Sequence, residues 1–407
     1  MTGPGGVQTS SKIKTQDGRR AFQSLLLHNF LSFGHNTDPF ELLPLNVLIG
    51  PNGSGKSNLI EAFTLLQGTP SDLAAPIREG GTVREWLWKG ANPPGTARLE
   101  AVVSYPKGRM PLRYCLSFGE TAQRFEVTDE RIENVSADIG YPKPYFYFGY
   151  EKGHPMVNVA GKNRTLHREE IDTRQSVLSQ RKDPDTYPEL TYIASLFGAI
   201  RVYRNWGFGR LTPPRVPQPT DLPNDFLSED ARNLGLILNW LERDPQTKSV
   251  FLQYLRELLS WAGDVGVLVQ GGTVQIFLEE RGRFVVPATR LSDGTLRWIS
   301  LLAILLHPNP PPLVCIEEPE LGLHPDLLPS LAQLLKDASE RMQLVITTHS
   351  DVLVDALNDV PDAVVVCENP DGSTRLRRLS AGALSGWLEK YTLGQLWRSG
   401  EIGGNRF

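Results

Sequence analysis

The stretch from Gly50 to Ser57 constrains the fold of this chain more than any other. It reads Gly-Pro-Asn-Gly-Ser-Gly-Lys-Ser, which fits the spacing G-x-x-x-x-G-K-S of a phosphate-binding P-loop. The apolar run 45–49 precedes it and predicts a buried strand, and residues 58–67 follow with the apolar spacing of a helix that ends at Gly68. A strand, a glycine-rich loop and a helix in this order predict an α/β nucleotide-binding fold.

Each residue type in the loop suits contact with a polyphosphate. Glycines let the backbone turn its N–H groups toward an anion, and the following helix directs the partial positive charge of its N-terminus at the same point. We expect the Lys56 ammonium to reach the outer phosphates and the Ser57 hydroxyl to bind Mg²⁺. The predicted nucleotide-binding residues of this half are Gly50, Asn52, Gly53, Ser54, Gly55, Lys56, Ser57 and Asn58.

Composition narrows the class of protein. The net charge of −4 argues against a chain that binds nucleic acid over its whole surface. It does not exclude a single basic face. The three cysteines are scattered, so we expect neither a disulfide framework nor a zinc site, and a reducing cytosol suits them. No apolar run approaches the roughly 20 residues that span a bilayer. We therefore expect a soluble cytoplasmic protein with no membrane partner.

The region after the P-loop helix predicts strands. Alternating apolar and polar residues over 97–105 and 112–118 flank the turn sequence Pro106-Lys-Gly108 and predict a hairpin. Further strands are expected at 124–132 and 145–159, which makes this region an antiparallel β-meander. Aromatic residues in the later strands would allow base stacking with a nucleic acid. Strands favour aromatics for packing alone, however, and we take the packing interpretation.

A Pro-rich connector follows the meander. Five prolines between residues 211 and 224 predict an extended segment, and Arg215 within it is taken as a solvated loop residue. Helices are expected at 226–242 and 247–261, and strands within 267–286. This part of the sequence predicts a mainly helical insertion.

A second anion site is predicted near residue 292. Residues 290–295 read Arg-Leu-Ser-Asp-Gly-Thr and precede a predicted helix over 296–306. Ser292 suits the N-cap of that helix, and an exposed helix N-terminus with a serine and Gly294 beside it can bind an anion. One nucleotide does not need two such helices in one pocket. We therefore expect this helix to face a nucleotide held by another copy of the chain.

Two apolar strands end in polar groups. Residues 312–316 predict a buried strand that is followed by Glu317 and Glu318, and carboxylates at the C-terminal end of such a strand lie in the ligand crevice of α/β proteins. We expect Glu317 to hold Mg²⁺ and Glu318 to orient and polarise the attacking water. A further strand over 343–348 ends at His349, which is expected to contact the γ-phosphate or that water.

The motifs stand in the order P-loop, Leu-Ser-Asp-Gly-Thr, Ile-Glu-Glu-Pro-Glu, Leu-His-Pro and Thr-Thr-His-Ser. This order resembles the ABC-type ATPases, specifically the RecF/SMC-like branch of stand-alone AAA family ATPases. The run Glu-Pro-Glu-x-x-Leu-His-Pro is similar to the ATPase half of the overcoming-lysogenization-defect nucleases, and the opening Leu-His-Asn-Phe-Leu-Ser-Phe also looks like the RecF/SMC-like branch. The resemblance implies an α/β P-loop NTPase of ABC-ATPase type, with an antiparallel β-meander subdomain and a helical insertion.

The resemblance also implies an assembly. It is a homodimer with two ATP molecules at its interface, each held by Lys56 and Ser57 of one subunit and by Ser292 and Gly294 of the other. Mg²⁺ accompanies the ATP. Glu318 would be the catalytic carboxylate, in the same family scheme that assigns His349 as the switch histidine.

Three departures from the family pattern matter. Asp293 replaces a glycine of the family motif and brings a negative charge near the partner's phosphates. The glutamine of the Q-loop is not placed. The chain carries neither a long coiled coil nor a Toprim nuclease domain, so a nuclease or another effector would be a separately encoded partner.

The domain boundaries follow from these assignments. Residues 1–20 are expected to form a disordered leader, and 21–160 the N-terminal half of the ATPase core with its β-meander. The helical and Pro-rich insertion occupies 161–286. The C-terminal half of the core occupies 287–407, and a single terminal helix is expected over 381–398.

The leading hypothesis is Mg²⁺-dependent ATP hydrolysis that switches the protein between dimer states or conformations. The output would pass to DNA or to an effector protein, as in DNA repair or antiphage defence. One alternative is the nucleotide-binding subunit of a transporter, which the β-meander argues against. Another is a nucleotide-gated interaction module without hydrolysis, which the acidic pair and His349 argue against. A small-molecule kinase would not need the Leu-Ser-Asp-Gly-Thr helix.

Overall fold

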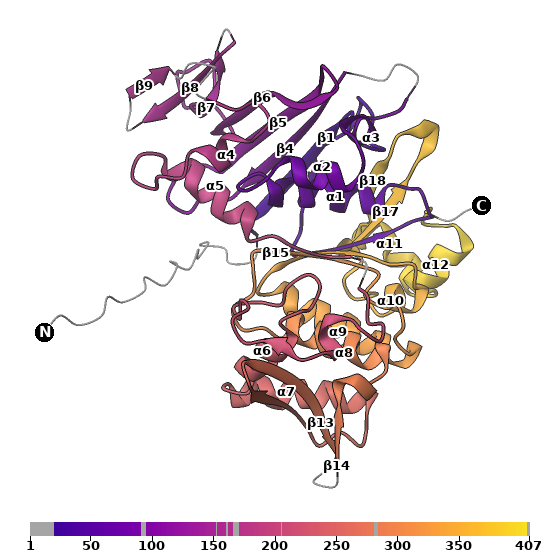
Figure 1. Cartoon of the computed structure of the whole chain (residues 1–407). Coiled ribbons are helices and arrows are strands. Elements are labelled where there is room, and N and C mark those ends of the chain that lie inside the picture. The colour runs from indigo at the N-terminus through magenta and orange to yellow at the C-terminus, as the bar shows by residue number, and fades with distance from the viewer. Residues whose placement is uncertain are drawn as a thin grey trace, which may run out of the picture.

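The computed structural model describes residues 20–90, 95–151, 153–159, 162–165, 171–204, 206–280 and 284–404. Figure 1 shows two lobes on opposite sides of a central sheet. Within the described ranges, no helix is both long enough and apolar enough to cross a bilayer. The predicted leader lies outside the described residues apart from Arg20.

The central sheet has six strands in the order β10-β15-β16-β3-β17-β18. All neighbours are parallel except β18, which runs antiparallel to β17. The strands are β3 (Leu45–Ile49), β10 (Arg201–Tyr203), β15 (Leu313–Glu317), β16 (Gln343–Thr347), β17 (Val364–Glu368) and β18 (Arg375–Arg378). A parallel sheet is covered on both faces, which explains why these strands read as continuous apolar runs.

The two faces of this sheet belong to two hydrophobic cores. On β3, Leu48 packs into the core around helix α1 (Lys56–Gly68), whereas Val47 and Ile49 pack into the core around α8 (Asp293–Leu305) and α9 (Leu328–Ser339). Successive side chains of a strand point to opposite faces, so one short strand serves both cores. The predicted strand, P-loop and helix are confirmed at this position.

The upper lobe is built on an eight-stranded antiparallel sheet in the order β2-β1-β4-β5-β6-β7-β8-β9. It contains the predicted meander. Its strands are β1 (Phe22–His28), β2 (Phe40–Glu41), β4 (Thr96–Val103), β5 (Leu112–Thr121), β6 (Arg124–Asn134), β7 (Phe146–Glu151), β8 (His154–Val159) and β9 (Lys162–Thr165).

Helices fill the space beside this sheet. They are α1 and α2 (Ala74–Glu79), α3 (Val83–Trp86), α4 (Val177–Gln180) and α5 (Pro188–Gly198). Phe63 of α1 packs edge-on against Phe22, whose other neighbour Phe197 is stacked on it at 5.9 Å. The P-loop helix is therefore packed between the two sheets, as Figure 1 shows, and this packing fixes its N-terminus.

The lower lobe is not only helical. It contains α6 (Leu234–Leu241), α7 (Pro245–Leu258), α8 and α9, together with a sheet of β11 (Gln218–Pro219), β12 (Asp264–Gln270), β13 (Thr273–Glu280) and β14 (Phe284–Pro287). The helix expected from residue 226 begins only at Leu234, because the buried Asn233 side chain holds the preceding loop by donating to Pro223 O and Phe226 O. The range 161–286 also contains β10 of the central sheet, so this segment contributes to the core; the domain boundaries themselves stay a prediction.

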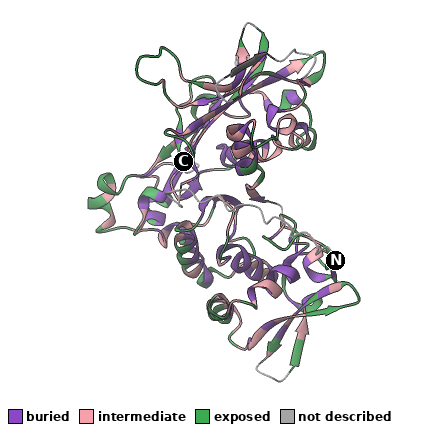
Figure 2. Cartoon of the chain, turned by 90° about the vertical axis from the view of Figure 1, so that its left-hand side faces the viewer, coloured by how far each residue is buried: buried purple, intermediate pink, exposed green. Residues whose placement is uncertain are grey.

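The C-terminal part differs from the single helix that was expected. The expected range 381–398 contains two short helices, α11 (Ala381–Leu388) and α12 (Leu393–Ser399), and α10 (Asp351–Asp355) lies earlier, after β16. Thr392 starts α12 with a capping box, in which its hydroxyl accepts from Gln395 N and the Gln395 side chain accepts from Thr392 N. A capping box marks the start of a helix, so α12 is a helix separate from α11. Figure 2 shows that burial is concentrated on the sheets and the helices packed on them.

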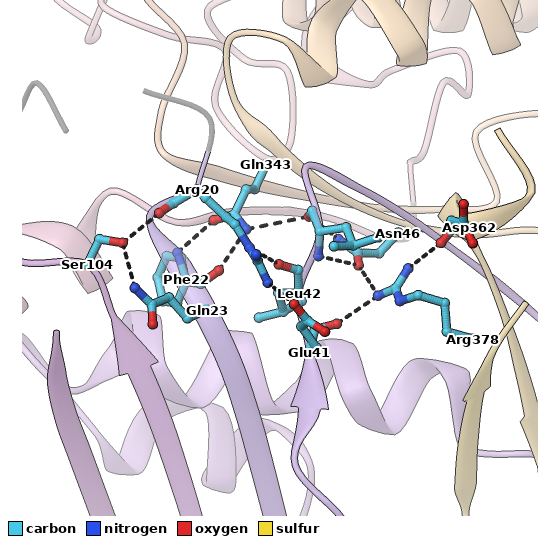
Figure 3. A network of polar contacts seen from close by, with 11 residues as sticks. Arg20, Phe22, Gln23, Glu41, Leu42, Asn46, Ser104, Gln343, Asp362 and Arg378 are labelled. Atoms are coloured by element: carbon cyan, nitrogen blue, oxygen red, sulfur yellow. Dashed lines mark hydrogen bonds and ion pairs between the residues drawn. The ribbon is translucent and has the colours of Figure 1, made fainter. Parts of the chain in front are cut away.

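A polar network fastens the amino ends of the parallel strands (Figure 3). The buried Gln343 side chain exchanges two hydrogen bonds with the backbone of Phe22, at 2.7 and 2.8 Å. The buried Asn46 side chain donates to Leu344 O and accepts from Arg378, at 3.0 and 2.6 Å. The Gln343 contacts join the two sheets where β3 and β16 begin, and the Asn46 contacts join strands of the central sheet. The opposite edge, where both strands end, carries the predicted site.

Candidate functional site

The P-loop lies at the carboxyl end of β3, and its glycines are required for two different reasons. A side chain on Gly50 would place its Cβ 2.3 Å from Cys367 O, and one on Gly55 would place it 2.1 Å from Thr374 Oγ1. Gly53 has φ +80° with nothing within 4 Å of a Cβ, so only its backbone conformation requires glycine. The loop is packed against β17 and β18 on one side and open at its tip.

Lys56 lies under its own loop. Its Nζ donates to Gly50 O at 2.7 Å and to Pro51 O at 3.0 Å, and the residue is buried. Burial lowers the pKa of Lys56, while the nearby carboxylates Glu318 and Glu317 act in the opposite direction. The charged end of this lysine is thus held at the loop by carbonyl oxygens alone, which a phosphate can replace as partner.

A hydroxyl network supports the loop from behind. Asn58 Nδ2 donates to Ser32 Oγ at 2.7 Å, and the Thr374 hydroxyl donates to Ser54 O at 2.9 Å and lies 2.7 Å from Ser32 Oγ. The Asn58 side chain therefore serves the scaffold, and its predicted nucleotide contact stays a prediction. Sequence reasoning did not assign roles to Ser32 and Thr374. The only signal was that Ser32 lies in the opening segment on which the family resemblance rested.

Ser57 and Glu317 come together as predicted. Glu317 ends β15, and burial raises its pKa, while the charge of Arg204 and a hydrogen bond from the Ser57 side chain act in the opposite direction. Arg204 Nε lies 3.6 Å from Glu317 Oε1. That oxygen is buried and has no hydrogen-bond partner among the residues that the structure describes. A buried carboxylate oxygen beside a serine hydroxyl is a donor set that suits Mg²⁺.

Glu318 occupies a strained position. Its φ is +44°, in the left-handed region that residues with a side chain rarely adopt. Two contacts hold it there, because its N–H donates to Thr347 O at 3.0 Å and its carbonyl accepts from Arg297 Nη1 at 3.1 Å. The result is that its side chain faces His349, whose Nε2 lies 3.5 Å from Glu318 Oε1. The structure brings together the two residues that were predicted to act on the attacking water.

Glu320 is a further member of the site that sequence reasoning did not single out. Its Oε1 accepts hydrogen bonds from the Thr348 hydroxyl and, at 2.9 Å, from the His349 backbone N–H. Burial raises the pKa of Glu320. Its other oxygen, Oε2, is buried without a hydrogen-bond partner in the described part of the chain. Glu320 therefore fixes the turn that presents His349.

The Ser292 turn has the predicted cap. Ser292 Oγ accepts from Thr295 N at 3.1 Å at the start of α8. A Cβ on Gly294 would lie 2.5 Å from Gly322 O, so glycine is needed for the close approach of the loop after β15. Among the described residues, no hydrogen bond or ion pair joins Ser292 or Gly294 to the P-loop of the same chain. Their predicted contact with a partner's nucleotide stays a prediction.

The expectation for Arg215 was wrong. Its side chain is buried, and it donates to the carbonyl oxygens of Phe208, Ala288 and Leu291 and to the Asp293 carboxylate. The Pro-rich connector folds back onto the start of α8, which brings this arginine under the Leu-Ser-Asp-Gly-Thr turn. The negative charge of Asp293 thus has a partner within the chain.

The site is not a protein-only metal cage. Within the described ranges, no three His, Cys, Asp or Glu side chains come together as metal ligands. Mg²⁺ is commonly held by one or two protein groups while phosphates and waters supply the remaining ligands. The pair of Ser57 and Glu317 fits that arrangement. The Q-loop glutamine is still not placed, and the residue after β10 at this edge of the sheet is Arg204.

Comparison with solved structures shows the fold. An SMC head bound to the C-terminal winged-helix domain of ScpA is similar with a TM-score of 0.57 and 14% identity, over 89% of this chain and 99% of that one. Two further SMC head domains, derived from Pyrococcus furiosus and Pyrococcus yayanosii, each give a TM-score of 0.52 with 14% and 13% identity, over 91% of this chain and 99% of theirs. The predicted ABC-type, SMC-like ATPase fold is confirmed.

Sequence similarity over most of the chain identifies its family. A search of curated proteins found no match. The family described as "AAA domain, putative AbiEii toxin, Type IV TA system" matches residues 45–355, which is more than half of the 407-residue chain and includes the P-loop, Glu317, Glu318 and His349. The chain therefore belongs to this family of AAA ATPase domains.

Proposed function

We propose that this protein binds ATP with Mg²⁺ and hydrolyses it. The observation that carries the proposal is the convergence of five side chains at one edge of the central sheet. They come from the start of α1 after the β3 loop, from the end of β15 and from the turn after β16, and these three strands are neighbours in the sheet. These side chains are Lys56, Ser57, Glu317, Glu318 and His349.

Each of these residues has a proposed role that follows from its chemistry. The P-loop N–H groups and Lys56 bind the phosphates, and Ser57 with Glu317 would hold Mg²⁺, which supplies positive charge to the phosphate oxygens. Glu318 would accept the proton of the attacking water. His349 lies beside Glu318 and orients the same water or the γ-phosphate.

The proposed output is a dimer that closes on ATP. The turn at Ser292 and Asp293 is exposed, which leaves it available to a second copy of the chain. One similar SMC head is described as bound to a domain of ScpA, and the description of the matching family includes the words "putative AbiEii toxin, Type IV TA system". By analogy, we infer that a DNA or protein effector receives the conformational change, in a cytoplasmic setting.

Two substitutions test the chemistry. Lys56→Ala is expected to abolish binding of a fluorescent ATP analogue, whereas Glu318→Gln is expected to bind it and to release no phosphate. Glu340→Gln, an exposed position at the end of α9, is the matched control and should keep wild-type turnover. Full phosphate release by Glu318→Gln would show that the assignment of the catalytic carboxylate is wrong.

Light scattering of Glu318→Gln tests the dimer. We expect the mass to double when Mg·ATP is added. A mass that stays at the monomer value with and without nucleotide would contradict ATP sandwiching between two copies. Asp293→Arg, which should block the partner's phosphate site by its bulk at the exposed turn, is expected to bind nucleotide and remain a monomer.

A further inference from the structure

Arg204 lies in the middle of the proposed metal site, although no motif pointed to it. It follows β10, the strand beside β15 at the edge of the central sheet. Its guanidinium lies next to three groups, two on α1 and one at the end of β15. Nη1 pairs with Glu61 Oε1 at 2.6 Å, Nη2 donates to Ser57 O at 3.0 Å, and Nε lies 3.6 Å from Glu317 Oε1.

The contact with Glu317 is incomplete. Arg204 Nε and Glu317 Oε1 are both buried, and neither has a hydrogen-bond partner among the described residues. Their separation of 3.6 Å is too long for a hydrogen bond, so the two opposite charges attract each other without closing the contact. Buried polar groups usually have a partner. The free carboxylate oxygen of Glu317 can coordinate a cation, whereas the guanidinium N–H of Arg204 cannot.

The charges around Arg204 and Glu317 favour a cation at this place. Glu61 and Glu317 bring negative charge next to Arg204, and Glu318 adds negative charge close to Glu317. Lys56 is near enough to Glu318 and Glu317 to interact with their charges, and its ammonium donates to the carbonyl oxygens of its loop. Without Arg204, the carboxylates would repel one another in a largely buried space. Arg204 therefore supplies, next to Ser57 and Glu317, positive charge of the kind that a divalent cation would also supply.

We propose that Arg204 is a resident counter-cation of this site, which balances Glu61 and Glu317 while no metal is bound and competes with the arriving divalent cation. The inference rests on the proposed function, since it concerns how the same site takes up Mg²⁺. Arg204 acts as a positioning residue through Glu317 and the first turn of α1. It sets the Mg²⁺ concentration at which the nucleotide binds.

This role predicts two effects of opposite sign. A positive charge a few ångströms from a divalent cation disfavours it, so replacing Arg204 by a neutral residue is expected to lower the half-saturating Mg²⁺ concentration by about tenfold. The same positive charge favours an anionic triphosphate that arrives without metal. The neutral variant is therefore expected to bind nucleotide more weakly in EDTA, by roughly severalfold. A purely structural role would weaken binding under both conditions.

The experiment measures binding of a fluorescent, non-hydrolysable ATP analogue to the full chain, first in EDTA and then along a Mg²⁺ titration. Arg204→Gln is the main variant, and Arg204→Met is the second, in case the first fails to fold as judged by circular dichroism. Arg201→Gln is the matched control. It changes the same residue type three positions earlier, at the start of β10, where the guanidinium donates to the carbonyl oxygens of Gly198 and Ile200. It should leave both values unchanged.

The possible outcomes separate failure of the inference from failure of the proposed function. A lower Mg²⁺ requirement together with weaker binding in EDTA, in either neutral variant but not in Arg201→Gln, supports the inference. An unchanged or higher Mg²⁺ requirement in a folded neutral variant, with the wild type binding normally, overturns it and leaves the proposed function standing. If the wild type binds no analogue at any Mg²⁺ concentration, the proposed function fails, and the inference fails with it.

Discussion

Adding one methyl group at two neighbouring P-loop glycines should have unequal effects on stability. Gly53 and Gly55 both have positive φ, +80° and +100°, so alanine is strained at either position. Their surroundings differ. A Cβ on Gly53 meets nothing within 4 Å, whereas a Cβ on Gly55 would lie 2.1 Å from Thr374 Oγ1 and 2.7 Å from Ser32 Oγ. The two side chains cannot both stay in place beside an alanine at 55.

The structure allows the difference to be estimated. Gly53→Ala carries only the cost of a side chain in the left-handed region, about 1 kcal/mol. Gly55→Ala carries that cost and also displaces the hydroxyls that hold the loop, which adds about 2 kcal/mol as for an overpacked interior. We therefore expect Gly55→Ala to lower the free energy of unfolding by about 3 kcal/mol and Gly53→Ala by about 1 kcal/mol.

Urea unfolding of the nucleotide-free protein, followed by circular dichroism, measures both values. Thr374→Ala supplies an internal control, since it removes the Oγ1 and Cγ2 atoms that the new methyl group would meet. In that background, the cost of Gly55→Ala should fall by about 1 kcal/mol, as contacting residues are not additive, and the cost of Gly53→Ala should not change. Equal unfolding midpoints for the two glycine variants would refute the reasoning from packing.

Three further predictions concern buried polar groups. Glu320→Gln should keep nucleotide binding but slow phosphate release, because the turn that presents His349 loses its charged acceptor; unchanged turnover would contradict this role. Burial raises the pKa of Glu130 to about 7, above its usual value, so the folded protein holds this proton as pH rises and stability should fall between about pH 5 and 7. Glu130→Gln should flatten that slope in urea unfolding measured at several pH values, and an unaltered slope would exclude Glu130 as its source. Arg215→Met should destabilise by about 2–5 kcal/mol, because several carbonyl oxygens lose a buried donor, whereas Asp293→Asn at a mostly exposed position should cost under about 1 kcal/mol in the same assay.

The sequence by itself determined the nucleotide-binding half of the core. The P-loop, the buried strand before it and the helix after it are local features, since glycine spacing and apolar periodicity act over a few residues. The strands that end at Glu317 and His349 could be predicted for the same reason. The β-meander could also be predicted, because alternating apolar and polar residues mark its strands and turn residues mark its hairpins. The residues that we propose to act on phosphate could thus largely be named before any tertiary structure.

Only the tertiary structure decided which residues support that chemistry. Ser32 and Thr374 are 342 positions apart in the chain and meet behind the P-loop, and Arg204 reaches Glu61 across 143 positions. A short strand such as β10 shows no periodicity of its own, so its place beside β15 was not predictable. Arg215 looked like a solvated loop residue because nothing local shows that the connector folds back onto α8. Contacts between distant segments depend on how the elements pack, and a pattern within one segment carries no information about them.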